Sequence, residues 1–268
     1  MNRMNLALSR LLLMVAAASF LTACSSTPDK PKAPELPVLN ASSASAPLTR
    51  AWSNQVGPIL FPLSLSVNNG QVAVASSSGT VALIDAANGQ DLWRLNLNTP
   101  LQAGVGGDGT RFAVVTQANE VLAVQSGQVI WRYRLNASTF TAPLVAGGRV
   151  FVLTADRSVM AFVGATGRQL WTQQRPGEPL VLKQAGVLLA FKNTLLVGLS
   201  GRLAGLDPNT GVIRWESAIA TPRGTNDVER LVDLVAPFAR LGDVVCVRAF
   251  PAAVGCVNAE LGKGVWPR

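Results

Sequence analysis

Five short segments of this chain share one pattern, a glycine four residues before a tryptophan. They are NGQDLW (88–93), SGQVIW (126–131), TGRQLW (166–171), TGVIRW (210–215) and LGKGVW (261–266). A sixth tryptophan, Trp52, precedes them, and neighbouring tryptophans lie 38 to 51 residues apart. A period near 40 residues indicates a repeat architecture, in which each unit packs against the next one.

Inside each unit, short apolar runs alternate with turns that contain glycine. In the first unit the expected strands are QVAVA, TVALID and QDLWRLNL, and the same plan starts again at Arg149 and at Thr194. Glycine turns between runs rich in β-branched residues are typical of β-hairpins. Four short strands in about 40 residues, repeated along a chain, predict a β-propeller. We therefore expect an all-β fold of four-stranded blades over residues 50–268.

The tryptophans have a structural explanation in such a fold. Each blade leaves apolar faces that only its neighbours cover, and a tryptophan at a fixed place on the outer strand packs between two blades. The alternative is an aromatic platform for a substrate. We expect all six to be blade tryptophans, namely Trp52, Trp93, Trp131, Trp171, Trp215 and Trp266.

The N-terminus has the features of a secretory signal. Arg3 and Arg10 flank its basic start, and the apolar run of 10 residues that follows is shorter than the roughly 20 of a transmembrane helix. The run ends in LTAC, which resembles the bacterial lipobox, so we expect a signal peptide over residues 1–23 and lipid on Cys24. An ordinary signal peptide that contains a cysteine is the alternative.

The segment after Cys24 is expected to be a tether. Residues 25–49 are rich in Pro, Ser and Ala, so few of them would pack in a core. The lipobox resemblance also bears on location, because Ser25 stands where lipoproteins retained at the inner membrane have Asp. It therefore implies an anchor in the outer membrane, facing the periplasm.

The composition excludes some classes of site. The chain has no histidine, which removes the commonest general base and the commonest metal ligand. Its net charge of +8 falls to +6 without residues 1–23, which hold two arginines and no acid. Lysines and arginines are not clustered among aromatic residues, so we expect no nucleic-acid partner. A solvated basic surface is the plain explanation, and attraction to anionic partners is the weaker one.

Cys246 and Cys256 lie in DVVCVRAFPAAVGCVNAE (243–260), which predicts a hairpin that turns near Pro251. Facing residues of an antiparallel pair have a constant sum of their numbers, and a hairpin centred at 251 makes the two cysteines face each other. The oxidising periplasm favours a bond between them. We expect a disulfide, with two reduced, half-buried thiols as the alternative.

The repeats ALIDAANGQDLW and AGLDPNTGVIRW resemble the tryptophan-docking repeat of eight-bladed PQQ-type propellers. The Gly-His and Trp-Asp marks of WD40 repeats are absent. One branch of the resembled family, the quinoprotein dehydrogenases, binds pyrroloquinoline quinone with calcium, uses an acidic base and usually has adjacent cysteines. This chain has no adjacent cysteine pair and only 15 acids. The lipobox, the linker and the propeller together resemble the other branch, the cofactor-free BamB family of the outer-membrane β-barrel assembly machinery.

The segment PLVLK (179–183) resembles a loop with which the BamB family contacts its barrel partner, BamA. Two alternating leucines precede a basic residue in that loop, which implies contact residues at Leu180, Leu182 and Lys183. Lysine stands where the family has arginine, and it lacks the bidentate fork of a guanidinium. The alternative is that both leucines are core positions of a strand, and an edge strand would also let a partner add a strand of its own.

The segment RGTNDVERLVDLV (223–235) resembles the second contact loop of that family. The match implies contact residues at Arg230, Leu231 and Asp233, with Val235 where the family often has a further acid. The alternative is that Asp233 is a solvated loop acid. Extra length in a propeller falls in surface connections, and the interval between Trp215 and Trp266 is the longest of the series.

The number of repeats is smaller than the resemblance implies. The six tryptophans define about five blades of an expected eight. RAWSNQVG (50–57) is expected to be an extra strand, which in the resembled family completes the last blade. We therefore expect a propeller truncated at its C-terminus. Closure of a smaller ring, or pairing between molecules, is the alternative.

The resemblance implies a non-enzymatic scaffold without a cofactor, a metal or a small-molecule substrate. Its partners would be BamA and other components of the β-barrel assembly machinery, and it would assist the insertion of β-barrel proteins into the outer membrane. One alternative is a PQQ-dependent dehydrogenase or a relic of one. Another is a propeller module with an unrelated partner.

Overall fold

The structure is a computed structural model that describes residues 49–175, 180–251 and 253–265. These residues form five antiparallel sheets of four strands each, joined by turns and loops. The chain divides into two units, Met1–Thr49 and Arg50–Arg268, and the sheets all belong to the second. Across the described ranges, no helix is long and apolar enough to cross a membrane.

The sheets follow the chain order, and each is one blade. The first consists of β1 (Ser66–Asn68), β2 (Gln71–Ala75), β3 (Thr80–Asp85) and β4 (Asp91–Asn96), and the second of β5 (Leu101–Gly107), β6 (Arg111–Thr116), β7 (Glu120–Gln125) and β8 (Gln128–Arg134). The third consists of β9 (Leu144–Ala146), β10 (Arg149–Leu153), β11 (Ser158–Val163) and β12 (Gln169–Gln174). The fourth consists of β13 (Leu188–Phe191), β14 (Thr194–Leu199), β15 (Arg202–Leu206) and β16 (Ile213–Ala218). The fifth consists of β17 (Asp233–Leu241), β18 (Val244–Phe250), β19 (Ala253–Asn258) and β20 (Lys263–Gly264).

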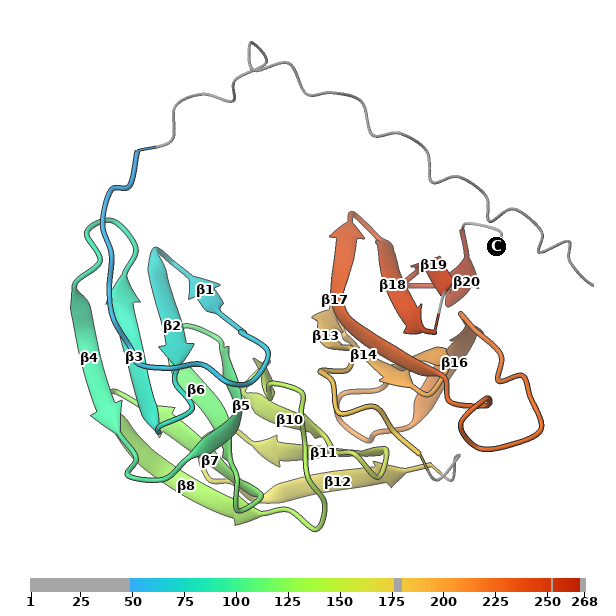
Figure 1. The fold of residues 1–268 in the computed structure, drawn as a ribbon, viewed down its shortest axis with the longest axis horizontal. Coiled ribbons are helices and arrows are strands. Elements are labelled where there is room, and N and C mark those ends of the chain that lie inside the picture. Colours follow the sequence, from blue (N-terminus) through green and yellow to red (C-terminus); the bar gives the residue numbers. More distant parts are fainter. Residues whose placement is uncertain (1–48, 176–179, 252, 266–268) are drawn as a thin grey trace, which may run out of the picture. The chain divides into compact units, whose positions relative to one another are not determined.

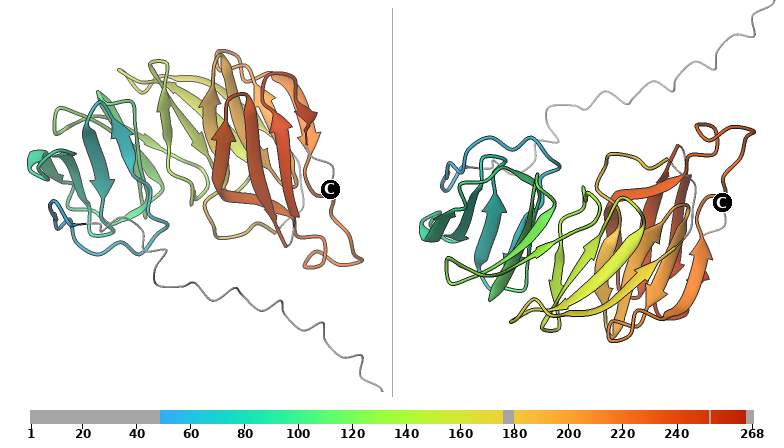
Figure 2. Two further views of the ribbon diagram at one scale, coloured as in Figure 1. Left: turned by 90° about the horizontal axis from the view of Figure 1, so that it is seen from above. Right: turned by 90° about the horizontal axis from the view of Figure 1, so that it is seen from below.

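Within this unit the blades form an arc, with strands such as β1 and β5 on its inner side and β4, β8 and β12 on its rim (Figure 1). Figure 2 shows the same sheets from two other sides, again following one another in chain order. The runs predicted from the sequence coincide with the second, third and fourth strands of their blades. The inner strands were missed because strands such as β1 and β9, with 3 residues each, carry no readable alternation.

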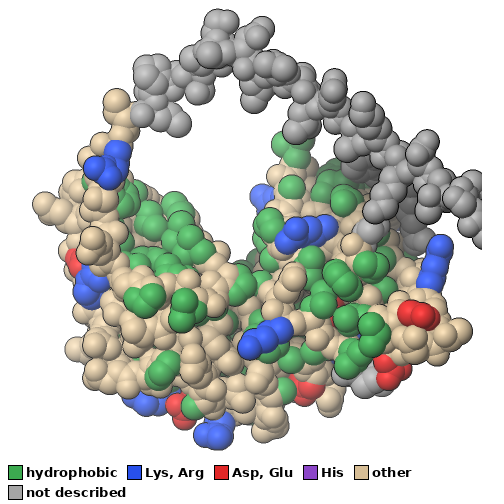
Figure 3. All heavy atoms as spheres, viewed as in Figure 1, with side chains coloured by type: hydrophobic (Ala, Val, Ile, Leu, Met, Phe, Trp, Pro, Cys, Tyr) green, Lys and Arg blue, Asp and Glu red, His purple; other side chains and the backbone are tan. Residues whose placement is uncertain are grey.

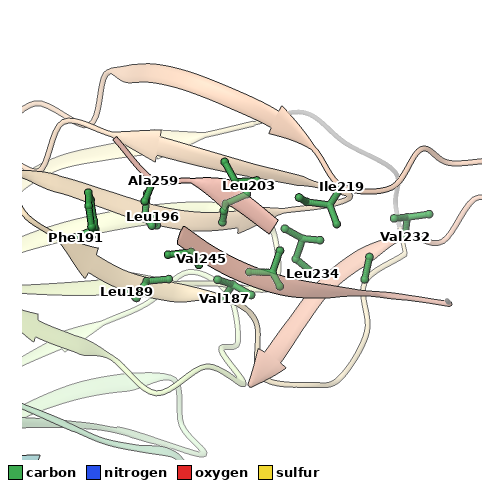
Figure 4. Packing of buried hydrophobic residues seen from close by; sticks show 13 residues of the cluster. Val187, Leu189, Phe191, Leu196, Leu203, Ile219, Val232, Leu234, Val245 and Ala259 are labelled. Carbon is green, nitrogen blue, oxygen red and sulfur yellow. The ribbon is translucent and has the colours of Figure 1, made fainter. Parts of the chain in front are cut away.

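The core lies between neighbouring blades. Four clusters of buried apolar residues join the first blade to the second, the second to the third, the third to the fourth and the fourth to the fifth. Figure 4 shows the last of these, in which Leu196 and Leu203 of the fourth blade pack with Val245 of the fifth. No cluster of described residues joins the first and fifth blades, so a smaller closed ring is not formed by this part of the chain.

Each tryptophan of the described residues rests on the glycine turn of the following repeat. A Cβ atom at Gly89, whose φ is +75°, would lie 2.6 Å from the ring of Trp52, so only glycine fits there. The indole of Trp52 donates a hydrogen bond to the carbonyl of Ala86 at 2.9 Å, three residues before that glycine. The rings of Trp131, Trp171 and Trp215 lie as close to Gly167, Gly211 and Gly262, while Trp93 lies in looser contact with Gly127, its nearest atom 3.4 Å from the position of a Cβ atom there.

This contact explains the spacing in the repeat. In the segments that end at Trp93, Trp131, Trp171 and Trp215, the glycine receives the tryptophan of the previous repeat, and the tryptophan four residues later packs on the glycine of the next one. A bulge precedes the tryptophan, since Leu83 pairs with Trp93 but Ile84 pairs with Asp91, which leaves Leu92 without an opposite residue. The same shift recurs in the second, third and fourth blades. A bulge redirects the side chains next to it, and here it turns each tryptophan toward its neighbour.

The prediction of a strand at residues 50–57 is wrong. A strand needs a neighbouring backbone to satisfy its N–H and C=O groups, and no described strand pairs with these residues. Side-chain contacts hold the segment instead. Asn54 donates to the carbonyl of Gly89 at 2.9 Å, and Arg94 donates to the Asn54 side chain at 2.9 Å.

Candidate functional site

The loop of residues 180–183 connects the third blade to the fourth. Leu180 is 39% exposed, Leu182 is half-buried and Lys183 is exposed. These residues form no strand, so they are neither the core strand nor the edge strand that the sequence left open. The ammonium of Lys183 lies 5.9 Å from the centre of the Phe140 ring, within the range of a cation–π contact.

Two charged side chains from other segments hold the backbone of this loop. Arg157, in the turn between β10 and β11, donates from Nη2 to the carbonyl of Leu180 at 2.9 Å. Asp233, the first residue of β17, accepts a hydrogen bond from the N–H of Leu182 at 2.8 Å. The loop is therefore fixed from the third blade on one side and from the fifth blade on the other.

The next residues of the chain are fixed in a similar way. The N–H of Gly186 donates to the hydroxyl of Thr141 at 2.9 Å, and Gly186 forms an isolated antiparallel bridge with Val235 of β17. The N–H of Ala236 donates to the carbonyl of Ala185 at 2.9 Å. These bonds satisfy backbone groups that would otherwise be left unpaired at the foot of the loop.

Asp233 is half-buried, and burial raises the pKa of its carboxyl group. The hydrogen bond from Leu182 and the positive charge of Arg157 act in the opposite direction and lower this pKa. Arg157, Leu182 and Asp233 line one small cavity of about 60 Å³. The structure thus brings Leu182 and Asp233, which the sequence placed in two separate motifs, into direct contact.

Arg230 and Leu231 lie on a different element, a turn just before β17. Asn226 and Glu229 organise it, since the Asn226 side chain accepts from the N–H of Glu229 at 2.9 Å and the Glu229 carboxylate accepts from the N–H of Thr225 at 2.8 Å. The bond from Thr225 is the main reason why the pKa of Glu229 is lowered. Arg230 is exposed and Leu231 half-buried, beside a hollow of about 570 Å³ that Arg223, Glu229 and Val232 line.

A larger hollow of about 640 Å³ lies on the inner side of the blades. Leu63, Leu65, Phe140, Leu188 and Phe238 give it an apolar lining, and Arg248 is the single ionisable residue among those that line it. Figure 3 shows hydrophobic side chains on the walls around the open side of the arc. Within the described ranges, no three Cys, Asp or Glu residues gather closely enough to hold a metal ion.

The remaining candidates divide into described and undescribed residues. Cys246 and Cys256 face each other in the β18–β19 pair, in the register that the sequence predicts, and they are joined by a disulfide with an S–S distance of 2.04 Å. Cys24 and Trp266 lie outside the described residues.

None of the sequence motifs predicts a functional role for Arg157. It lies in ADRS (155–158), which the pattern marks only as a turn. Arg157 has a positive φ of 62°, as residues in tight turns often do. Its side chain is nevertheless buried, whereas turn residues are usually exposed. A charged residue in the turn of an otherwise apolar hairpin is the one signal that would have drawn attention to it.

Comparison with protein families gives a match over most of the chain. Residues 77–268 match the model of a family described as outer membrane protein assembly factor BamB. The chain is 33% identical over 262 residues to the protein of that name from Burkholderia pseudomallei, which covers 94% of this chain and 67% of that protein. It is 31% identical over 222 residues to the one from Bordetella pertussis, over 81% of this chain and 58% of that protein. The chain thus spans only part of the length of these relatives.

Solved structures show the same fold. The crystal structure of BamB from Moraxella catarrhalis superposes with a TM-score of 0.69 at 20% identity, over 76% of this chain and 62% of that one. The quinohemoprotein alcohol dehydrogenase of Comamonas testosteroni gives a TM-score of 0.55 at 15% identity, over 75% of this chain and 42% of that one. At these identities the likeness concerns the blades and their arrangement only.

Proposed function

The chain belongs to the family of outer membrane protein assembly factor BamB, and from this premise we propose that it is a non-enzymatic scaffold of the β-barrel assembly machinery. In this proposal it binds BamA and works with other components of the machinery. It thereby assists the assembly of β-barrel proteins and their insertion into the outer membrane.

The observation that carries the proposal is the fixed loop at residues 180–183. Leu180 presents part of its apolar side chain to the solvent in this loop, while the hydrogen bonds from Arg157 and to Asp233 hold the loop backbone in one conformation. A preformed loop loses little conformational entropy when a partner binds to it. Leu180, Leu182 and Lys183 are the proposed contact residues here, and Arg230, Leu231 and Asp233 contribute from the neighbouring turn and strand.

The proposed location follows from the N-terminal motif. Lipid on Cys24 would hold the protein at the periplasmic face of the outer membrane, and residues 25–49 would provide the reach between anchor and propeller. A Cys24→Ala variant should then leave the outer-membrane fraction. Mass spectrometry of the mature N-terminus checks the same point, since an unmodified mass would contradict the anchor.

The enzyme alternative makes a different demand on the inner hollow. A quinoprotein would need carboxylates there as calcium ligands and as a catalytic base, and the residues that line the hollow supply only the guanidinium of Arg248 as an ionisable group. Titration of the purified protein with pyrroloquinoline quinone and calcium tests this alternative. Saturable uptake with redox activity toward an alcohol would overturn the scaffold proposal.

Co-purification with BamA tests the scaffold proposal directly. A variant with Leu180→Ser and Leu182→Ser should lose most of its binding to BamA. Leu92→Ser is the matched control, because Leu92 is also exposed, at 49%, but lies on the outer strand of the first blade. Circular dichroism must stay unchanged in both variants. Equal binding by wild type and the double variant would show that the loop is not the contact.

A further inference from the structure

We propose that Arg157 is a positioning residue for partner binding, which together with Asp233 clamps the backbone of residues 180–183 from two different blades. This inference rests on the proposed function, because it assigns the way in which the contact loop is held. It adds a residue that none of the sequence motifs contains.

The clamp has two arms that act on alternate residues of the loop. Arg157 takes the carbonyl of Leu180, and Asp233 takes the N–H of Leu182. One arm is a donor and the other an acceptor, so neither side chain is able to replace the other. Both hydrogen bonds involve a charged group and a backbone group, which makes them stronger than bonds between neutral groups.

The turn that carries Arg157 is itself firmly built. The Asp156 carboxylate accepts hydrogen bonds from the hydroxyl of Thr154 at 2.5 Å and from the N–H of Ser158 at 3.2 Å. The N–H of Arg157 donates to the carbonyl of Thr154 at 3.0 Å. These bonds fix the backbone on both sides of Arg157, so the guanidinium is directed from a rigid element onto a loop that has no strand partner of its own at residues 180–183.

The two arms also influence each other. Arg157 is 9% exposed, and its charge lowers the pKa of the Asp233 carboxyl against the effect of burial. Loss of the arginine therefore removes one hydrogen bond from the loop and also favours a neutral Asp233, which is a weaker acceptor for the N–H of Leu182. For this reason the effects of the two residues on the loop should not be additive.

Binding to purified BamA and amide hydrogen exchange of the loop together test the clamp. Arg157→Met removes the donor but keeps a long apolar side chain, and we expect it to weaken binding by about tenfold, the effect of roughly 1.4 kcal/mol. Exchange in the loop peptide should become about tenfold faster, while the β10 and β11 amides stay protected. Arg157→Lys keeps the charge and a donor, so it should restore most of the binding.

Arg149→Met is the matched control. Arg149 lies at the other end of the same hairpin and likewise donates to a backbone carbonyl, that of Gly147, and in addition to the side chain of Asn209. It should leave both binding and loop exchange unchanged. A variant that combines Arg157→Met with Asp233→Asn should bind about as weakly as whichever single variant binds less tightly. If the two residues acted independently, the fold-losses of affinity of the single variants would multiply instead.

The outcomes separate this inference from the proposed function. If wild-type protein does not bind BamA, the proposed function fails, while loop exchange in the variants still decides whether the clamp exists. If Arg157→Met weakens binding without faster loop exchange, or leaves both unchanged, the clamp is wrong. If Arg157→Met does not fold, loop exchange in Asp233→Asn decides instead, and slow exchange like that of wild type in this variant overturns the clamp.

Discussion

The first and the fifth blade each have one face that no other described blade covers, and the two faces differ sharply. On the first blade this face consists of Val74, Ala82 and Ile84, which are only 6%, 0% and 3% exposed. Residues of the N-terminal segment, Trp52 among them, pack over all three. The covered face is therefore as well shielded from solvent as the interfaces between blades.

On the fifth blade the corresponding face is open. Val245, Val247 and Ala249 of β18 point into the core shared with the fourth blade, so the residues between them face the other way. That outer face exposes three large apolar side chains, Leu241 at 86%, Phe250 at 40% and Val254 at 58%. It also carries the disulfide, whose two cysteines lie directly opposite each other on β18 and β19.

The comparison shows two ways of securing the end of a propeller blade. On the first blade, the segment around Trp52, which pairs with no described strand, provides the tryptophan that a neighbouring blade provides elsewhere. Burial of apolar surface stabilises this end. On the fifth blade the two middle strands are joined covalently, and their outer face exposes Phe250 and Val254. The two ends should therefore respond to different perturbations.

The largest expected effect is the loss of the tryptophan that covers the first blade. Trp52→Ala removes the ring from Gly89 and from Val74, and should lower the free energy of unfolding by about 3 kcal/mol, at the low end for a tryptophan because Trp52 is only half-buried. Trp52→Phe keeps a ring but loses the bond to Ala86, and should cost about 1 kcal/mol. Urea unfolding followed by circular dichroism measures both. A loss below about 1 kcal/mol for Trp52→Ala would show that the segment does not seal the blade.

Removal of the disulfide should have the next largest effect. The bridge closes a short loop, with a sequence separation of 10, and its loss should cost about 2 kcal/mol through the entropy of the unfolded chain. The double variant Cys246→Ala and Cys256→Ala should match the wild type in reductant. Because the first blade lies far along the arc, this loss should add to that of Trp52→Ala. A clear deviation from additivity would mean that the two ends are coupled.

In the acidic range, the stability contributed by one carboxyl group on the first blade and by one on the fifth blade should depend on pH in opposite directions. Asp91 on the first blade accepts hydrogen bonds from Arg94 and Asn54, which lower its pKa below the usual value, so the stability it contributes is lost as pH falls through that lowered pKa. Asp233 on the fifth blade has a pKa raised by burial, so the folded state holds its proton more tightly than the unfolded one. Its contribution is present below the ordinary pKa and is lost as pH rises through the raised one.

Carbon-13 titration of the two carboxyl groups measures both shifts. The Asp91 signal should move at a lower pH than that of a free aspartate, and the Asp233 signal at a higher pH. In an Asp233→Asn variant, the fall of stability with rising pH in the acidic range should be reduced. A common midpoint for both carboxyl groups would contradict the opposite shifts of their two pKa values.

Local pattern predicted most of the fold because its causes are local. The glycine turns and apolar runs located strands such as β2, β3 and β14 to within a residue, and the register that pairs Cys246 with Cys256 followed from the position of Pro251. The prediction failed at residues 50–57, where the pattern around Trp52 matched a repeat but strand formation depended on a partner backbone. No described strand provides one there.

The site was less predictable because its contacts join distant parts of the chain. Leu182 and Asp233 were proposed from a family resemblance, and their hydrogen bond, across 51 residues of sequence, becomes visible only in the structure. Arg157 was missed altogether. Its partner Leu180 lies 23 residues away, and its contact is with a backbone carbonyl, which any residue at that position would offer. The sequence therefore does not indicate which residue accepts this hydrogen bond.

The smallest expected effect gives the sharpest comparison of the two ends. Leu241→Ala removes three carbons from a side chain that is 86% exposed, and should change the free energy of unfolding by less than about 0.5 kcal/mol. Ile84→Val removes a single carbon from a side chain that is 3% exposed, yet it should cost about 1 kcal/mol because the methyl group leaves a closed core. Urea unfolding at equal protein concentration compares the two variants. A larger loss for Leu241→Ala than for Ile84→Val would mean that the outer face of the fifth blade is covered in solution, and the contrast between a buried end and an open, cross-linked end would then be lost.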